Sequence, residues 1–430
     1  MSTYAEFLAA KRAPAPINPV TVVDIPEILF PFQRELVEWA LERGRGAVFA
    51  DCGLGKTLIQ LAWASNVWRN KGGKALILAP LAVAAQTKRE GEKCGIPVTV
   101  CREPEDVDLG INVTNYERVG RFADLPWTAL VLDESSILKA FDGKTREMLT
   151  AFGRAIPYRL CCTATPSPND HEELGGHAEF LGVMSRKQML AEFFINDGIS
   201  AGHWRLKGHG RRAFWRWVNQ WAQALRSPVD MGYPEDGFAL PLLSIEVERV
   251  DADAVSGDRL FAVPVSTLAE RRQARRESLP LRVALAAERV NESDESWVVW
   301  CDLNAESAAL AALIPDAVEV KGADHPDVKE ERLTAFTTGE ARVIVSKPSI
   351  AGWGLNWQHC HNVLFVGLSD SYEQFYQAVR RCWRFGQKHP VTAHIIASSR
   401  EQAVLENIKR KQRQAKEMFA ELVAARREVP

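Results

Sequence analysis

Short apolar runs recur along the chain, and segments with the spacing of amphipathic helices separate them. In the first half these runs occupy residues 47–50, 74–80, 110–114, 129–134 and 158–166. Continuous apolar runs of this kind are typical of strands that are buried on both faces of a sheet. Strands that alternate with helices favour a parallel, doubly wound sheet, so we predict an α/β fold for this half.

The second half of the chain repeats this pattern. Helical spacing covers residues 304–313 and 328–336, and strands are expected at residues 297–300, 317–320, 342–345 and 362–366. A chain of 430 residues is long enough for two domains. We therefore predict four segments in order: an N-terminal lead-in (1–28), a first α/β lobe (29–235) with a helical extension at about 185–230, a second α/β lobe (236–400) and a terminal basic helix (401–430).

A glycine turn joins the run at residues 47–50 to the helical segment that follows it. Glycines allow the backbone to curl so that its N–H groups point at a phosphate chain, and the next helix presents the positive end of its dipole to the same anion. Lys56 would add a positive charge near the outer phosphates, and the Thr57 hydroxyl would ligate Mg²⁺. Ala50 stands where the usual pattern has glycine. The turn predicts a nucleotide site with contacts from Asp51, Gly53, Leu54, Gly55, Lys56 and Thr57.

Two carboxylates stand at the end of the run at residues 129–134. In an open parallel sheet, ligands bind at the carboxyl ends of the strands. There, Asp133 would hold Mg²⁺ through water, and Glu134 would activate the attacking water as the catalytic base. An acidic helix start is the alternative, because helix N-termini favour Asp and Glu. Farther upstream, the Gln33 amide offers both a donor and an acceptor, which suits the edge of adenine.

Composition narrows the class of protein. The chain is 46% hydrophobic and 25% charged, as in a folded globular protein, and its net charge of −2 means that any basic surface is local. Its eight cysteines include no C-x-x-C pair, so we expect reduced core thiols in a cytosolic protein rather than a zinc site. Residues 1–19 lack the features of a secretory signal, and the apolar stretch at 75–85 is too short to span a bilayer. We therefore expect no membrane partner.

Basic and aromatic residues gather at residues 204–221. Basic side chains neutralise phosphates and aromatic rings stack on bases, so Arg211 and Arg212 are candidate contacts to a nucleic-acid backbone. Part of the segment has helical spacing, which favours core packing over base stacking for Phe214, Trp217, Val218 and Trp221. The basic runs at residues 271–276 and 409–413 fit either a nucleic-acid contact or a solvated helix face.

The order of these motifs resembles the motor core of a superfamily 2 helicase. The first half supplies its segments at residues 32–33, 51–57, 133–134 and 163–166. The second half is similar to the Swi2/Snf2 branch in two places. Residues 346–356 end in Gly352-Trp353-Gly354-Leu355-Asn356, similar to the GLGLN ending of that family, and residues 377–387 read QAVRRCWRFGQ, similar to its QA..R..R.GQ motif. The resemblance covers roughly residues 30–400.

The resemblance implies two RecA-like lobes in tandem, with ATP and Mg²⁺ in a cleft between them. It also implies that Arg381 and Arg384, three apart on an expected helix, reach the γ-phosphate from the second lobe as arginine fingers. Gly354 and Gln377 would contribute to the same nucleotide site. Nucleic acid would cross both lobes on a face formed by Pro80, Asn115, Tyr116, Thr163, Ser346 and Lys347.

Two positions depart from the family pattern. The family usually has histidine two places after the glutamate, and here Ser135-Ser136 follow Glu134, which leaves the coupling of the nucleotide site to the other motifs open. The segment near Lys88 has Gln86 and lacks the usual tryptophan of the family. Neither change removes a group that hydrolysis needs.

The sequence therefore predicts an ATP-dependent DNA translocase reduced to its motor, whose ATPase activity is stimulated by nucleic acid, with duplex DNA favoured. A strand-separating helicase on DNA or RNA is one alternative. A scaffold that clamps nucleic acid without hydrolysis is another, and the intact Lys56, Glu134, Arg381 and Arg384 argue against it. We expect a cytoplasmic monomer. The compact size and the lack of a visible accessory module favour a bacterial cell or a phage-infected host as its source. A protein partner that supplies targeting is left open.

Overall fold

The computed structural model describes residues 17–80, 83–139, 143–196, 204–235, 237–250, 273, 275–352, 354–398 and 401–426. The chain divides into two compact units, the first formed by Met1–Glu235 with Ala415–Pro430 and the second by Asp236–Gln414. Residues 1–16 of the expected lead-in, Trp353 of the glycine-rich motif and residues 271, 272 and 274 of the basic run 271–276 lie outside the described residues.

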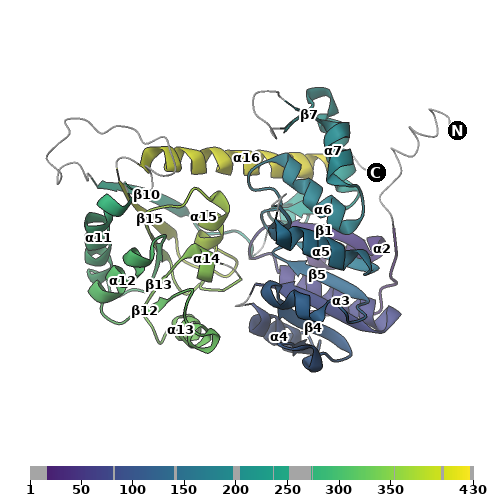
Figure 1. The fold of residues 1–430 in the computed structure, drawn as a ribbon, viewed down its shortest axis with the longest axis horizontal. Helices are drawn as coiled ribbons and strands as arrows, with labels where there is room; N and C mark the ends of the chain where they lie inside the picture. The colour runs from purple at the N-terminus through teal and green to yellow at the C-terminus, as the bar shows by residue number, and fades with distance from the viewer. Residues whose placement is uncertain are drawn as a thin grey trace. The chain divides into compact units, whose positions relative to one another are not determined.

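The first unit is built on a seven-stranded sheet in which every pair of neighbouring strands is parallel, in the order β3-β4-β2-β5-β6-β1-β9. Figure 1 shows strands of this sheet, among them β1, β4 and β5, with helices of the same unit beside them. The strands are β1 (Arg45–Ala50), β2 (Lys74–Ala79), β3 (Val98–Val100), β4 (Gly110–Asn115), β5 (Ala129–Asp133), β6 (Tyr158–Cys162) and β9 (Ala222–Leu225). A separate antiparallel pair joins β7 (Phe194–Asn196) to β8 (Trp204–Leu206). Because the main sheet is parallel, the carboxyl ends of its strands lie along one edge, where ligands bind in such folds.

Helices connect these strands, and their ends carry the expected signals. Helix α2 (Pro31–Arg43) has Pro31 in its first turn and is followed by Gly44, which caps it in a left-handed conformation (φ 66°). The helices of the first unit are α2 (Pro31–Arg43), α3 (Lys56–Lys71), α4 (Ala84–Lys93), α5 (Lys144–Arg154), α6 (Leu174–Leu181), α7 (Arg186–Phe193) and α8 (Arg211–Asn219). The 3₁₀ segments are η1 (Pro104–Asp106), η2 (Tyr116–Phe122), η3 (Ser135–Lys139), η4 (His171–Glu173), η5 (Gly208–Gly210) and η6 (Pro228–Met231).

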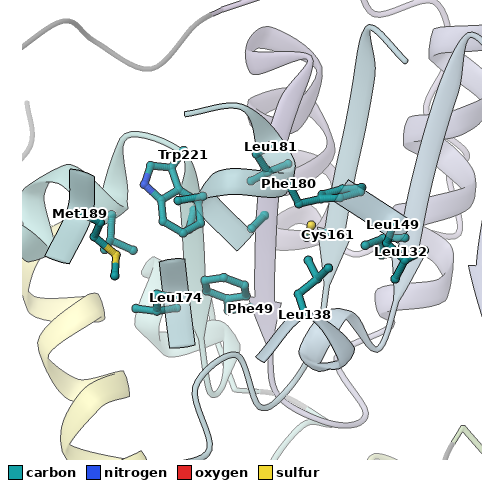
Figure 2. Close-up of a cluster of buried hydrophobic side chains, with 14 of the residues drawn as sticks. Phe49, Leu132, Leu138, Leu149, Cys161, Leu174, Phe180, Leu181, Met189 and Trp221 are labelled. Carbon is teal, nitrogen blue, oxygen red and sulfur yellow. The ribbon is translucent and has the colours of Figure 1, made fainter. Parts of the chain in front are cut away.

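The core of the first unit lies against the sheet. Figure 2 shows Phe49, Leu132 and Cys161 from three neighbouring strands together with side chains of α6 and with Trp221. The aromatic residues of α8 belong to the same buried cluster, so core packing is confirmed for Phe214, Trp217, Val218 and Trp221. Apolar residues from the end of the last helix, α16 (Gln402–Arg426), complete the cluster: Met418, Phe419, Leu422 and Ala425.

The second unit is built on a six-stranded parallel sheet in the order β10-β15-β14-β11-β13-β12. Its strands are β10 (Leu243–Val250), β11 (Trp297–Cys301), β12 (Ala317–Val320), β13 (Val343–Ser346), β14 (Asn362–Val366) and β15 (Val391–Ser398). Its helices are α11 (Leu279–Asn291), α12 (Asn304–Leu313), α13 (Pro326–Thr338), α14 (Pro348–Ala351) and α15 (Tyr372–Val379). Helix α16 is divided between the units, with Gln414 the last residue of the second and Ala415 in the first.

Two buried arginines of the second unit form ion pairs with carboxylates. Arg282 on α11 and Glu306 on α12 have fully buried side chains and lie 2.7 Å apart. Arg275 is also buried and forms ion pairs with Glu401 at 2.8 Å and with Asp302 at 2.6 Å. A solvated helix face is therefore wrong for Arg275, because a buried guanidinium is kept in place by its carboxylate partners.

The prediction of two parallel-sheet α/β lobes in tandem is confirmed. The strands β3, β7, β8, β9, β10 and β15 are additional to those that the sequence indicated. All eight cysteines are free thiols, and all except the half-buried Cys94 are buried, as expected for core residues. In the part of the chain that the structure describes, no helix combines the length and the apolar character needed to cross a membrane.

Candidate functional site

The glycine turn lies at the carboxyl end of β1 and leads into α3. Gly53 (φ 87°) and Gly55 (φ 75°) both adopt conformations that side chains disfavour. A Cβ added at Gly55 would lie 2.2 Å from Nε2 of Gln33, so the loop is closed around a residue without a side chain. The sequence therefore folds here into a tight backbone cradle at a helix N-terminus, which is the geometry that favours an anion.

Lys56 is the first residue of α3 and folds back over this cradle. Its Nζ donates to the carbonyl of Ala50 at 3.0 Å and to that of Asp51 at 3.4 Å. A phosphate oxygen would be a stronger acceptor for the ammonium group than these neutral carbonyls. The structure thus brings Lys56, Gly53 and Gly55 together as predicted.

Gln33, near the start of α2, forms a hydrogen bond with the glycine turn. Its Nε2 donates to the Leu54 carbonyl at 3.0 Å, and its Oε1 accepts from the Phe30 N–H at 2.9 Å. The side chain is 2% exposed, so both halves of the amide are used within the protein. Recognition of adenine by Gln33 stays a prediction.

Asp133 is the last residue of β5 and is buried. Its Oδ1 accepts a hydrogen bond of 2.7 Å from Nε2 of Gln60, which lies on α3 one turn after Lys56. Burial, followed by the charge of Glu134, raises the pKa of Asp133 to about 6, against the opposing effects of Gln60 and Lys56. The phosphate loop and this carboxylate therefore belong to one site at the edge of the sheet.

Glu134 follows directly and has a backbone φ of 57°, an uncommon conformation for a residue with a side chain. The Thr163 hydroxyl, from the segment after β6, donates to Oε2 of Glu134 at 3.3 Å. Strain of this kind persists where the surrounding structure fixes it, and it clusters at functional sites. The conformation fixes the direction of the Glu134 carboxylate relative to Asp133.

A buried histidine supports the turn after Glu134, and sequence reasoning missed it. His177 on α6 is fully buried, and its Nε2 lies 3.1 Å from Oγ of Ser135, at hydrogen-bond distance. Burial lowers the pKa of His177 to about 3, so the ring is neutral. The sequence has serines where the family has histidine, and the structure brings a histidine to this turn from another element.

In the second unit, two arginines of the motif at residues 377–387 donate to the same carbonyl group. Nη1 of Arg381 and Nη1 of Arg384 both donate to the Leu355 carbonyl, at 3.0 and 2.8 Å. Arg381 also donates to the Oε1 and the carbonyl of Gln377, both at 2.9 Å. Gly354, which precedes this carbonyl, has a φ of 72°. The structure thus brings Gln377, Arg381, Arg384 and Gly354 together within the second unit.

The expected helix through these arginines is wrong. Helix α15 ends at Val379, and Arg381 and Arg384 lie in the turns that follow it. The carbonyl of Arg381 accepts from the Trp357 N–H at 2.9 Å, so this bond to another segment takes the place of a helical one. A shared acceptor, rather than a shared helix face, brings the two guanidinium groups together.

The candidate nucleic-acid residues differ in exposure. Four are buried with hydroxyl or amide groups bonded inside the protein: Asn115 to the Arg118 N–H, Tyr116 to the Asp133 carbonyl, Thr163 to Glu134 and Ser346 to the Val320 carbonyl. Pro80 and Lys347 are half-buried, and Arg212 is exposed. Arg211 forms an ion pair with Glu421 on α16. None of these positions is tested as a nucleic-acid contact, and each stays a prediction.

Two stretches of the chain match known protein families. Residues 32–197 match the SNF2-related domain, and residues 287–386 match the helicase conserved C-terminal domain. A chain with these two domains on two parallel-sheet lobes has the core of a superfamily 2 helicase. It belongs to the Snf2-like branch of that superfamily.

Individual proteins are similar over part or most of the chain. Protein p41 of Acyrthosiphon pisum secondary endosymbiont phage 1 is 27% identical over 176 residues, which span 35% of this chain and 38% of p41. The chain therefore matches well under half the length of that relative. The solved structure of the Sulfolobus solfataricus SWI2/SNF2 ATPase core in complex with dsDNA is 16% identical, with a TM-score of 0.45 and coverage of 89% of this chain and 90% of that one.

Proposed function

We propose that the chain is an ATP-dependent DNA translocase, an ATPase stimulated by nucleic acid that couples hydrolysis of ATP to ADP and phosphate to movement along duplex DNA. One observation carries the proposal. The glycine cradle, Lys56, Asp133 and Glu134 meet at the carboxyl edge of one parallel sheet, and hydrogen bonds from Gln60 and Thr163 orient both carboxylates.

The residues of this edge fit a nucleotide with Mg²⁺. The cradle offers backbone N–H groups and an ammonium group to phosphates, as described above. Asp133 is a buried carboxylate with a raised pKa, and a divalent cation would offset the cost of its burial. Thr57, the second residue of α3, and Asp133 are the residues assigned to hold the metal. When bound, Mg²⁺ would neutralise charge on the phosphates.

The protein groups then have distinct tasks. Glu134 orients the attacking water and accepts its proton on Oε1, because Oε2 is bonded to Thr163. Arg381 and Arg384 stabilise the charge that develops on the transferred phosphoryl group, as the family pattern implies. Nucleic acid is held by its backbone, through the basic and polar residues assigned from the sequence, so sequence preference is weak.

A polynucleotide series tests the function. ATP turnover is measured for the wild-type chain and Glu134→Gln with no polynucleotide, duplex DNA, single-stranded DNA and RNA. We expect duplex DNA to stimulate wild-type turnover most, and Glu134→Gln to lose turnover by at least about two orders of magnitude while nucleotide affinity is kept. Highest stimulation by single-stranded DNA or RNA would favour a strand-separating helicase. No turnover with any polynucleotide would favour a non-hydrolysing scaffold.

A further inference from the structure

We propose that Gln60 is a positioning residue for the divalent cation of the nucleotide site. Its amide donates to Asp133 and leaves its carbonyl oxygen to accept a hydrogen bond from a water bound to that cation. The inference deepens the proposed function and rests on it.

Gln60 is placed for this role by helix geometry. It lies four residues after Lys56 and three after Thr57, so all three project from neighbouring positions on one face of α3. Its Nε2 reaches Asp133, 73 residues away in sequence, at 2.7 Å. One side chain therefore connects the helix of the phosphate loop to the end of β5.

The other half of the amide lacks a hydrogen-bond partner. Gln60 is fully buried, and among the described residues its Oε1 has no partner at hydrogen-bond geometry; the Cys162 thiol, a weak donor, is the other polar group beside this amide. A buried acceptor without a partner is costly, and such a group in a folded protein calls for an explanation. An acceptor that points away from the donating Nε2 beside a carboxylate suits a donor such as a metal-bound water.

Asn66, another buried amide on α3, serves as a comparison for Gln60 because its contacts indicate a purely structural role. Asn66 is also fully buried, and its Oδ1 accepts from the N–H groups of Val23 and Asp24 at 2.7 and 3.0 Å. Its Nδ2 donates to the carbonyls of Asp24 and Ala62 at 2.7 and 2.8 Å. Both halves of Asn66 are satisfied within the protein, whereas only one half of Gln60 is, so packing of α3 does not explain Gln60.

The test measures metal binding directly. Mn²⁺, used as a probe for Mg²⁺, is titrated into the ADP complex and free Mn²⁺ is followed by electron paramagnetic resonance. Gln60→Leu keeps the buried volume and removes both polar groups, so we expect Mn²⁺ affinity to fall at least about tenfold. ADP affinity in EDTA should stay within about threefold of wild type, since no phosphate contact is lost.

Asn66→Leu is the matched control. It removes a buried amide from the same helix, so we expect a lower melting temperature and wild-type Mn²⁺ affinity. If Gln60→Leu does not fold, Gln60→Met is used with the same expectation, since methionine is close to glutamine in length. Wild-type Mn²⁺ affinity in the folded Gln60 variant would overturn the inference alone. A wild-type chain that binds no ADP would overturn the proposed function and the inference with it.

Discussion

At the scale of single residues, the site depends on hydrogen bonds that fix two adjacent carboxylates. Glu134 adopts a φ of 57°, and the Thr163 hydroxyl bonds its Oε2 at 3.3 Å. Asp133 is bonded in the same way by Gln60 at 2.7 Å. Each carboxylate thus has one oxygen engaged by a neutral donor, which orients the other oxygen without cancelling its charge.

Thr163→Val tests the orientation of the catalytic base. Valine keeps the shape of threonine and removes the hydroxyl, so Glu134 loses a hydrogen bond to a charged group, about 1.5–3 kcal/mol. We expect ATP turnover at saturating ATP and DNA to fall about ten- to a hundredfold with nucleotide affinity unchanged. Thr114→Val, which removes the buried hydroxyl bond to the Cys101 carbonyl, is the control and should keep wild-type turnover. Equal turnover in both variants would contradict the role of Thr163.

His177 predicts how stability depends on pH. The folded protein keeps its ring neutral because burial lowers the pKa of His177 to about 3, whereas in the unfolded chain it takes up a proton below its ordinary value of 6.5. The contribution of His177 to stability is therefore complete above pH 6.5 and is lost as the pH falls from there toward 3.

Urea unfolding at about pH 7.5 and pH 5.5 measures this effect. Wild type should lose about 1 kcal/mol more of its unfolding free energy between the two pH values than His177→Gln. His209→Gln changes an exposed histidine and should retain the wild-type loss. The assignment fails if His177→Gln and wild type lose the same amount.

At the scale of elements, continuous apolar runs predicted most of the strands because strands buried on both faces need no polar alternation. Strand β9 (Ala222–Leu225) was missed because alanine, leucine and glutamine also suit a helix. Strand β15 was missed because Thr392 and His394 interrupt its apolar run. The end of α15 could not be predicted, since the Arg381 carbonyl that follows it accepts from the Trp357 N–H of another segment rather than from the next helical turn.

The end of α16 is predicted to stabilise the first unit. Leu422 is 1% exposed in the cluster that contains the aromatic side chains of α8. Leu422→Ala should lower the unfolding free energy of this unit by about 2–5 kcal/mol, because a cavity forms in a packed core. Denaturant unfolding followed by tryptophan fluorescence measures the change. The control is Leu109→Ala, at a leucine that is 69% exposed, which should change the unfolding free energy by less than about 0.5 kcal/mol. Similar losses of unfolding free energy in the two variants would contradict the packing role of Leu422.

At the scale of the whole molecule, the order of motifs was enough to predict two parallel-sheet lobes and the family. The same reasoning could predict the cradle, Asp133 and Glu134, because each lies next to a strand end that the apolar pattern marks. It could not find the pair of Gln60 with Asp133 or of His177 with Ser135, which are 73 and 42 residues apart. Such pairs depend on how the elements pack against one another, and the spacing of residues along the sequence does not reveal that packing.

We have proposed that Arg384 takes part in the hydrolysis of ATP, although Lys56, Asp133 and Glu134 belong to the other unit of the chain. ATP turnover of Arg384→Ala at saturating duplex DNA tests it most directly, with ADP affinity measured beside it. We expect ADP affinity to stay within about threefold of wild type, while ATP turnover falls about a thousandfold or more. Turnover within about threefold of wild type would contradict the claim.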